Sequence, residues 1–152
     1  TTSPQRSILN TGFYIIVATD QGVYYSNNNG SVWRKSALDL KVVNAFLLNG
    51  ETVIAVADNG IFYSYDNGAS WTTATFKNET NKVPYAGCIT KSGKNIYAGL
   101  KSDGVYISAN YGLSWTKFNT GMDPAPGVLD MAVADGYLYI GTNGNGIWKI
   151  KL

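Results

Sequence analysis

The amino-acid sequence predicts an all-β protein built from four copies of one antiparallel unit, and three observations support this fold class. The segment Gly22–Ser26 (GVYYS) returns as GIFYS at 60–64, as GVYIS at 104–108 and as GIWKI at 146–150. Aromatic residues make up 13% of the chain and 17 residues are glycine, which suits short strands joined by tight turns. The apolar residues do not follow the 3.6-residue period of a helix, so helices should be nearly absent.

The spacing of the four copies indicates what kind of β protein this is. The first glycines of the copies are 38, 44 and 42 residues apart, which is the length of one four-stranded propeller blade. We therefore predict a β-propeller domain over residues 1–152, with blades at approximately 5–38, 40–77, 83–119 and 127–152.

The second copy shows the strands of a blade most clearly. Its apolar runs and turn residues predict an innermost strand, an Asn49-Gly50 hairpin turn and three further strands, at 42–48, 52–57, 61–64 and around 71–76. The first copy aligns with it without gaps, which places its two inner strands at 7–10 and 13–18. The last copy predicts strands at 128–134, 137–141 and 146–151, without an outermost strand.

Three copies continue into an eight-residue motif: Ser26-Asn-Asn28-Asn-Gly30-Ser-Val-Trp33, Ser64-Tyr-Asp66-Asn-Gly68-Ala-Ser-Trp71 and Ser108-Ala-Asn110-Tyr-Gly112-Leu-Ser-Trp115. These segments resemble the Asp-box, or bacterial neuraminidase repeat, with the pattern Ser/Thr-x-Asp-x-Gly-x-x-Trp. Turn chemistry explains the motif, because Asp or Asn accepts backbone hydrogen bonds, Gly takes a positive φ and Trp offers a large apolar face. We interpret the twelve motif residues as structural and expect Trp33, Trp71 and Trp115 to be buried.

Proteins with this repeat include sialidases, xyloglucan-cleaving glycosidases, sortilin-type receptors and the photosystem II assembly factor, so the resemblance leaves the function open. Sialidases clamp a sugar carboxylate with three arginines, whereas this chain has only Arg6 and Arg34. Other glycosidases need two facing carboxylates. Asp20, Asp58 and Asp103, with Asn143 in the last copy, are candidates for one ligand-facing end, but for the three acids we favour the interpretation as turn-forming Asp before Gly.

The sequence favours a non-catalytic module that binds a protein or a glycan, with a glycosidase-like enzyme fragment as the alternative. We assign no catalytic residue, no metal and no cofactor, because histidine is absent and Cys88 is the only cysteine. The net charge of +2 comes without a Lys/Arg run, so nucleic acid is not expected as a partner. No apolar stretch is long enough for membrane insertion. Two glycosylation sequons, at Asn29 and Asn78, are compatible with an extracellular or periplasmic location.

The predicted blade edges suggest an assembly. The strand at 146–151 would have an unpaired edge that is able to pair with another segment, and residues 1–4 are a short candidate for that role. Asp-box families form rings of six or more blades, so we expect four blades to be half of a larger propeller. A homodimer with eight blades is one way to complete it, and a closed four-bladed ring is the alternative.

Overall fold

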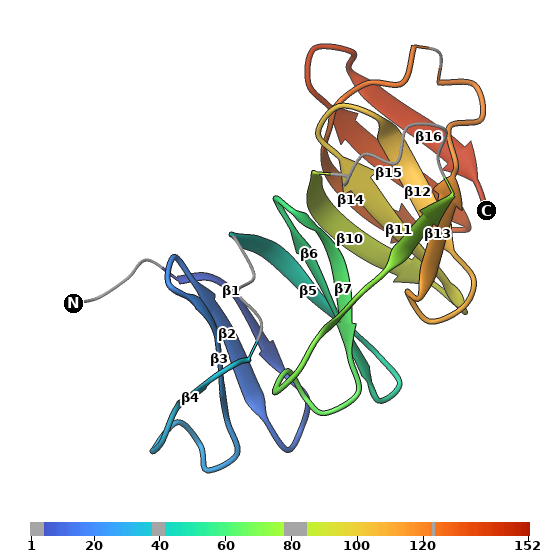
Figure 1. Ribbon diagram of the computed structural model, residues 1–152. Helices are drawn as coiled ribbons and strands as arrows, with labels where there is room; N and C mark the ends of the chain where they lie inside the picture. The colour runs from blue at the N-terminus through green and yellow to red at the C-terminus, as the bar shows by residue number, and fades with distance from the viewer. Residues whose placement is uncertain (1–4, 38–41, 78–84, 123) are drawn as a thin grey trace.

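The computed structural model describes residues 5–37, 42–77, 85–122 and 124–152, and every regular element in these ranges is a β-strand. The strands form four sheets that follow one another along the chain (Figure 1). The candidate closing segment at 1–4 and the second sequon at Asn78 lie outside the described residues. Within the described ranges, no helix has the length and apolar character needed to cross a membrane. The structure confirms the all-β class, with the sheets arranged as propeller blades.

Blade 1 is a four-stranded antiparallel sheet whose strands pair in chain order. Its strands are β1 (Gln5–Asn10), β2 (Ile15–Thr19), β3 (Gly22–Ser26) and β4 (Arg34–Lys35). The second strand begins two residues later than predicted, because the chain first makes a turn in which the Asn10 side chain accepts the Gly12 N–H at 2.8 Å. Phe13, predicted to lie in this strand, instead lies in the turn and is 86% exposed.

Blade 2 repeats this arrangement with one addition that the sequence did not predict. Its strands are β5 (Val43–Asn49), β6 (Thr52–Ala57), β7 (Gly60–Ser64) and β8 (Thr72–Thr73). The single outer strand expected around 71–76 is wrong, because the chain divides into β8 and a separate strand β9 (Thr75–Lys77). Strand β9 leaves blade 2 and pairs in parallel with β13 of blade 3, and the Thr75 N–H donates to the Leu113 carbonyl at 2.9 Å. Blades 2 and 3 are therefore joined by backbone hydrogen bonds.

Blades 3 and 4 complete the row. Blade 3 comprises β10 (Ala86–Ser92), β11 (Asn95–Leu100), β12 (Gly104–Ser108) and β13 (Ser114–Lys117), with β9 added outside β13. Blade 4 has three strands, as predicted: β14 (Val128–Ala134), β15 (Tyr137–Thr142) and β16 (Ile147–Lys151). All four innermost strands have a register irregularity near their first residues, which bends each strand at the same place.

The hydrophobic core lies between successive blades, and we name the two faces of each sheet accordingly. The leading face of a blade points toward the preceding blade, and the trailing face points toward the next. Between blades 1 and 2, Ile16, Ala18 and Val23 from the trailing face of blade 1 pack against a leading face that includes Phe62 and Trp71. Blades 2 and 3, and blades 3 and 4, pack in the same way.

The four blades form an open row in Figure 1, with β1 and β16 at opposite ends. The innermost strands contact one another in series, β1 with β5, β5 with β10 and β10 with β14. The closed four-bladed ring is therefore not the arrangement of this structure. As a result, the leading face of blade 1 and the trailing face of blade 4 have no neighbouring sheet within the described residues.

Candidate ligand-binding site

The three copies of the eight-residue motif form turns that we call box 1 (26–33), box 2 (64–71) and box 3 (108–115), and the three turns have the same hydrogen bonds. In each box the serine hydroxyl donates to the Oδ1 of the Asp or Asn two residues later, at 2.9, 2.8 and 3.0 Å. That Oδ1 also accepts the backbone N–H four residues further on, at 2.9, 2.8 and 3.0 Å. The glycine N–H donates to the serine Oγ at 3.0, 2.8 and 2.9 Å. One oxygen atom accepts both the serine hydroxyl and the N–H four residues on, so Asn is able to take the place of Asp in these bonds.

Each turn also uses the left-handed backbone region twice in succession. The residue before the glycine has a φ of 55°, 54° and 61° in boxes 1, 2 and 3, and the glycine itself has 81°, 86° and 87°. The first of these positions is Asn in boxes 1 and 2 and Tyr111 in box 3. Because Asn tolerates this region better than an aromatic residue does, box 3 is the strained member of the set.

The tryptophans differ among the boxes. Trp71 and Trp115 are 8% and 0% exposed, and their indole N–H groups donate to the Gly68 and Gly112 carbonyls at 3.1 and 2.9 Å. Trp33 is 42% exposed and has no such bond among the described residues, so the prediction that all three tryptophans are buried is wrong for Trp33. The reason is its place on the leading face of blade 1, against which no described sheet packs.

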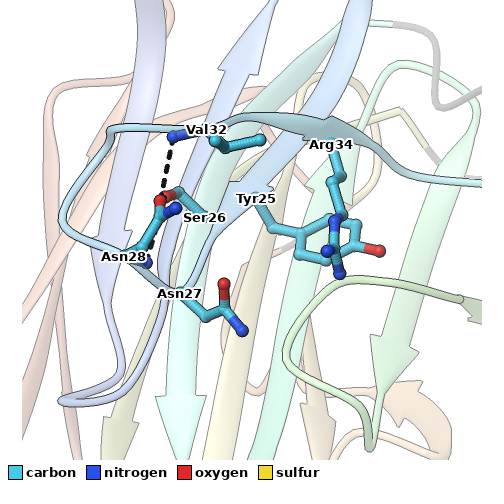
Figure 2. Close-up of a pocket in the computed structure, with 6 residues that line it drawn as sticks. All are labelled: Tyr25, Ser26, Asn27, Asn28, Val32 and Arg34. Carbon is cyan, nitrogen blue, oxygen red and sulfur yellow. Dashed lines mark hydrogen bonds between the residues drawn. The ribbon is translucent and has the colours of Figure 1, made fainter.

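Box 1 also borders a small surface hollow, which Figure 2 shows. Its lining comes from the end of β3, the box turn and the start of β4, and consists of Tyr25, Ser26, Asn27, Asn28, Val32 and Arg34. The hollow holds about 300 Å³ of empty space, part of which is open solvent. Tyr25 is half-buried and packs against the core between blades 1 and 2, whereas Asn27, Asn28 and Arg34 are exposed. We call this site the box 1 hollow.

The polar groups of the box 1 hollow are mainly hydrogen-bond donors. The Oδ1 of Asn28 accepts the Val32 N–H, which leaves the Nδ2 group outside the hydrogen bonds of the turn. In box 2 the corresponding Oδ2 of Asp66 accepts the Ser70 hydroxyl at 2.6 Å, and in box 3 the Nδ2 of Asn110 donates to Ser114 at 2.9 Å. Box 1 has Val32 at the serine position, so the Asn28 Nδ2 has no partner among the described residues. The Arg34 guanidinium likewise makes no ion pair within them.

The candidate ligand-facing residues at the other end of the blades have different surroundings. Asp58 accepts a hydrogen bond from the Asn44 side chain at 2.9 Å. Asp103 accepts the Tyr106 hydroxyl at 2.7 Å and forms an ion pair with Lys117 at 2.8 Å. Asp20 and Asn143 are exposed. The structure therefore places the four residues in equivalent loops, and Asp58 and Asp103 make these contacts within their own blades.

The connection that follows β13 is hydrogen-bonded to the loop that contains Asp103. The Oδ1 of Asn119 accepts the Val105 N–H at 2.8 Å, and its Nδ2 donates to the Asp103 carbonyl at 3.2 Å. A Cβ on Gly104 would lie 2.3 Å from the Asn119 side chain, so only glycine fits at this point. Asp103 is thus held in place by its own loop, by β13 and by the connection.

The pKa values of Cys88 and Asp66 are displaced from their ordinary values. Burial raises the pKa of the Cys88 thiol to about 12, with the charge of Asp130 adding to the effect. The thiol lies between blades 3 and 4 and is protonated at neutral pH. For Asp66, burial raises the pKa, but hydrogen bonds from Ser70 and Ser64 outweigh it and the net pKa lies below 3.8. Among the described residues, no three His, Cys, Asp or Glu side chains cluster in a way that could hold a metal ion.

The fold is similar to that of several solved β-propeller structures. The computationally designed Ika4 protein shares 10% identity, with a TM-score of 0.75, and the match covers 100% of this chain and 93% of that one. An ancestral GH74 enzyme shares 20% identity (TM-score 0.72), over 97% of this chain and 22% of that one. YCF48 bound to D1 peptide shares 15% identity (TM-score 0.66), over 97% and 48%. This chain thus spans about a fifth of the GH74 enzyme and about half of YCF48. At these identities the likeness shows the fold alone.

No protein-family model and no curated protein matches the sequence. Features shared by the copies do not point to Asn27, Val32 or Arg34, because these residues are not repeated in the other blades. A signal for these residues lies in the alignment of the first copy with the second. At these positions blade 2 has Tyr65, Ser70 and Thr72, so these three lining residues are ones in which blade 1 departs from its neighbour.

Proposed function

We propose that this protein is a non-catalytic β-propeller module that binds a protein or glycan partner. The observation that carries the proposal is the box 1 hollow, where an aromatic ring lies beside donors that have no partner among the described residues. Such a combination is typical of sites that hold a ligand by stacking and a few directed hydrogen bonds. The likeness to YCF48 bound to D1 peptide supports this, since a chain of similar fold holds a peptide.

The loops of Asp20, Asp58, Asp103 and Asn143 form a second proposed contact surface at the opposite end. Loops supported by a rigid sheet are where binding residues usually lie. Because Asp58 and Asp103 are held by neighbouring side chains, this surface would present fixed carboxylates to its partner. An extracellular or periplasmic location is part of the same proposal, and Asn29 of the first sequon is exposed.

The alternative function is that of a carbohydrate-active enzyme fragment. The likeness to an ancestral GH74 enzyme supports it, and the short span of that match means that any shared active site would need residues from elsewhere. The contacts of Asp58 and Asp103 favour the binding module, because a glycosidase needs a carboxyl group poised to exchange a proton with its substrate.

Arrays of glycans and of immobilised peptides, probed with the intact chain, test the proposal. We expect one class of ligand to be retained, and retention to fall when Arg34 or Asp58 is replaced. Aryl glycosides test the alternative in parallel. If the wild type hydrolyses an aryl glycoside and this activity is lost on changing Asp20, Asp58 or Asp103 to Asn, the enzyme hypothesis would replace the binding hypothesis.

We also propose that a second copy of the chain covers the two open blade faces, giving an eight-bladed homodimer. Trp33 is 42% exposed where the equivalent Trp71 and Trp115 are buried. At the other end Ile147 is 81% exposed, whereas the equivalent Val23, Ile61 and Val105 are buried against the next blade. Both ends therefore expose apolar residues of the kind that form the interfaces between blades, and a two-fold axis would bring each end against the other.

Light scattering at micromolar concentration tests the assembly. We expect a dimer, and we expect Trp33→Asp and Ile147→Asp to each yield a monomer that remains folded by circular dichroism. A wild-type species of 16.4 kDa at all concentrations would contradict the dimer.

A further inference from the structure

We infer that the box 1 hollow is a binding site for a carboxylate group. This inference rests on the proposed binding function and names the chemistry of the ligand. It begins from the hydrogen bonds of the turn, which hold the Asn28 Oδ1 and leave its NH₂ group without a partner among the described residues. The NH₂ group lacks the serine hydroxyl that occupies the same position in boxes 2 and 3.

The charge of the hollow favours an anion. None of its six lining residues is acidic, and Arg34 contributes a positive charge. The guanidinium has no acid partner within the described residues, whereas the exposed cation Lys117 is paired with Asp103. Arg34 and the Asn28 amide both line the hollow, and their N–H groups are donors for the oxygens of a carboxylate. Charge-assisted bonds from a guanidinium to a carboxylate are the strong ones.

Tyr25 supplies the apolar part of the site. Its ring lies 6.3 Å from that of Tyr14 and packs against the core between blades 1 and 2, so its position is fixed. The corresponding ring in blade 2, Tyr63, packs edge-on against Tyr65 at 5.5 Å. Blade 1 has the shorter Asn27 in place of Tyr65, which leaves the side of the Tyr25 ring open to the hollow. A ligand with a short carbon framework attached to its carboxylate fits this arrangement.

Two pairs of small probes test the carboxylate and identify its source. Glucuronic acid and glucose differ in the carboxylate of a sugar, and N-acetylaspartate amide and N-acetylasparagine amide differ in that of an amino acid. In ¹⁵N NMR titrations we expect the acid of at least one pair to change the chemical shifts of the backbone amides of residues 27–34. The neutral compound of the same pair should leave these chemical shifts unchanged. The acid that binds more tightly identifies the source as a glycan or as a peptide.

Three variants connect binding to the named groups. Arg34→Thr, which copies blade 2, should weaken acid binding at least about tenfold. Val32→Ser gives Asn28 the partner found in box 3, so it should weaken binding while the stability is unchanged or raised. Asn28→Asp should abolish binding by placing a negative charge in the hollow, while the turn is kept. Lys94→Thr, an exposed site with the same loss of charge, and Asp66→Asn in box 2 are the matched controls and should bind as the wild type does.

Several outcomes would overturn the inference: no amide shifts at millimolar acid, equal binding of the neutral compounds, or acid affinity unchanged in both Arg34→Thr and Val32→Ser. A weakening equal in Lys94→Thr and Arg34→Thr would also overturn it, since general charge alone would then act. If the small acids do not bind but an array ligand binds equally well to the wild type and to Arg34→Thr, the proposed binding function is retained and the carboxylate site is rejected.

Discussion

Blades 1 and 2 are a natural experiment within one chain, because their sequences align without gaps at a distance of 38 residues. Their box turns have the same Ser–Asx and glycine hydrogen bonds to within 0.2 Å. Their tryptophans nevertheless differ, with Trp71 8% exposed and Trp33 42% exposed. The turn is therefore a local structure that forms in either setting, whereas burial of the tryptophan depends on a neighbouring blade.

The surroundings of the box glycines show which contact with the preceding blade buries the tryptophans of boxes 2 and 3. A Cβ on Gly68 would lie 3.2 Å from the Ile16 side chain of blade 1, and one on Gly112 would lie 2.7 Å from the Ile54 side chain of blade 2. A Cβ on Gly30 would meet only its own Trp33. Boxes 2 and 3 thus each receive an isoleucine from the preceding blade, and the packing of that isoleucine encloses the box. Box 1 receives none.

The largest expected effect separates the tryptophans. Trp71→Ala should destabilise the protein by about 3–5 kcal/mol, because it removes a large buried ring that stacks on Phe46 at 6.0 Å. Trp33→Ala should cost about 1 kcal/mol or less in the monomer, as expected for an exposed site. Urea denaturation measures both. Equal losses in the monomer would contradict the role of the neighbouring blade.

The glycines should give the next largest effect. Gly112→Ala should cost about 2–3 kcal/mol, since its positive φ strains any side chain and the new Cβ would press on Ile54. Gly30→Ala has the strain without the clash, so about 1 kcal/mol is expected. Adding Ile54→Val, which removes the clashing methyl group, should reduce the cost of Gly112→Ala in a double-mutant cycle. Purely additive losses would show that the contact is unimportant.

A smaller effect depends on pH. The pKa of Asp66 is lowered in the folded state, so its carboxylate stabilises the fold above the ordinary value of 3.8, and this contribution is lost as the pH falls through the lowered pKa. Asp66→Asn removes the titrating group. The stability difference between wild type and variant should therefore shrink between about pH 6 and about pH 2. A difference that stays constant over this range would show that the charge contributes nothing.

The smallest expected effect concerns Tyr111. Its φ of 61° lies in the left-handed region, where boxes 1 and 2 have Asn29 and Asn67. Tyr111→Asn should stabilise the protein by about 0.5–1 kcal/mol, because it relieves backbone strain at an exposed position. The reverse change, Asn67→Tyr, should destabilise by a similar amount. Melting temperatures of the two variants would show opposite shifts if strain is the cause.

The strands, their order and the three box turns could be predicted from the sequence because they depend on residues close together in the chain. Period-two apolar runs, Asn-Gly turns and the Ser-x-Asx-x-Gly spacing specify local structure wherever they occur. The three-stranded blade 4 follows in the same way. Strand β9 could not be predicted, because Thr75–Lys77 pairs with a strand almost forty residues away and its own sequence does not name that partner.

The candidate site likewise has features that local sequence determines and features that depend on tertiary packing. The sequence by itself determined that boxes 1, 2 and 3 form similar turns and that Asn28 keeps the turn without a charge. Only the tertiary structure decided that Trp33 is exposed, that Asp58 and Asp103 are held by Asn44, Tyr106 and Lys117, and that Tyr25 and Arg34 line one hollow. The physical reason is that hydrogen bonds within a turn act over a few residues, whereas burial and open hollows are set by how whole sheets pack.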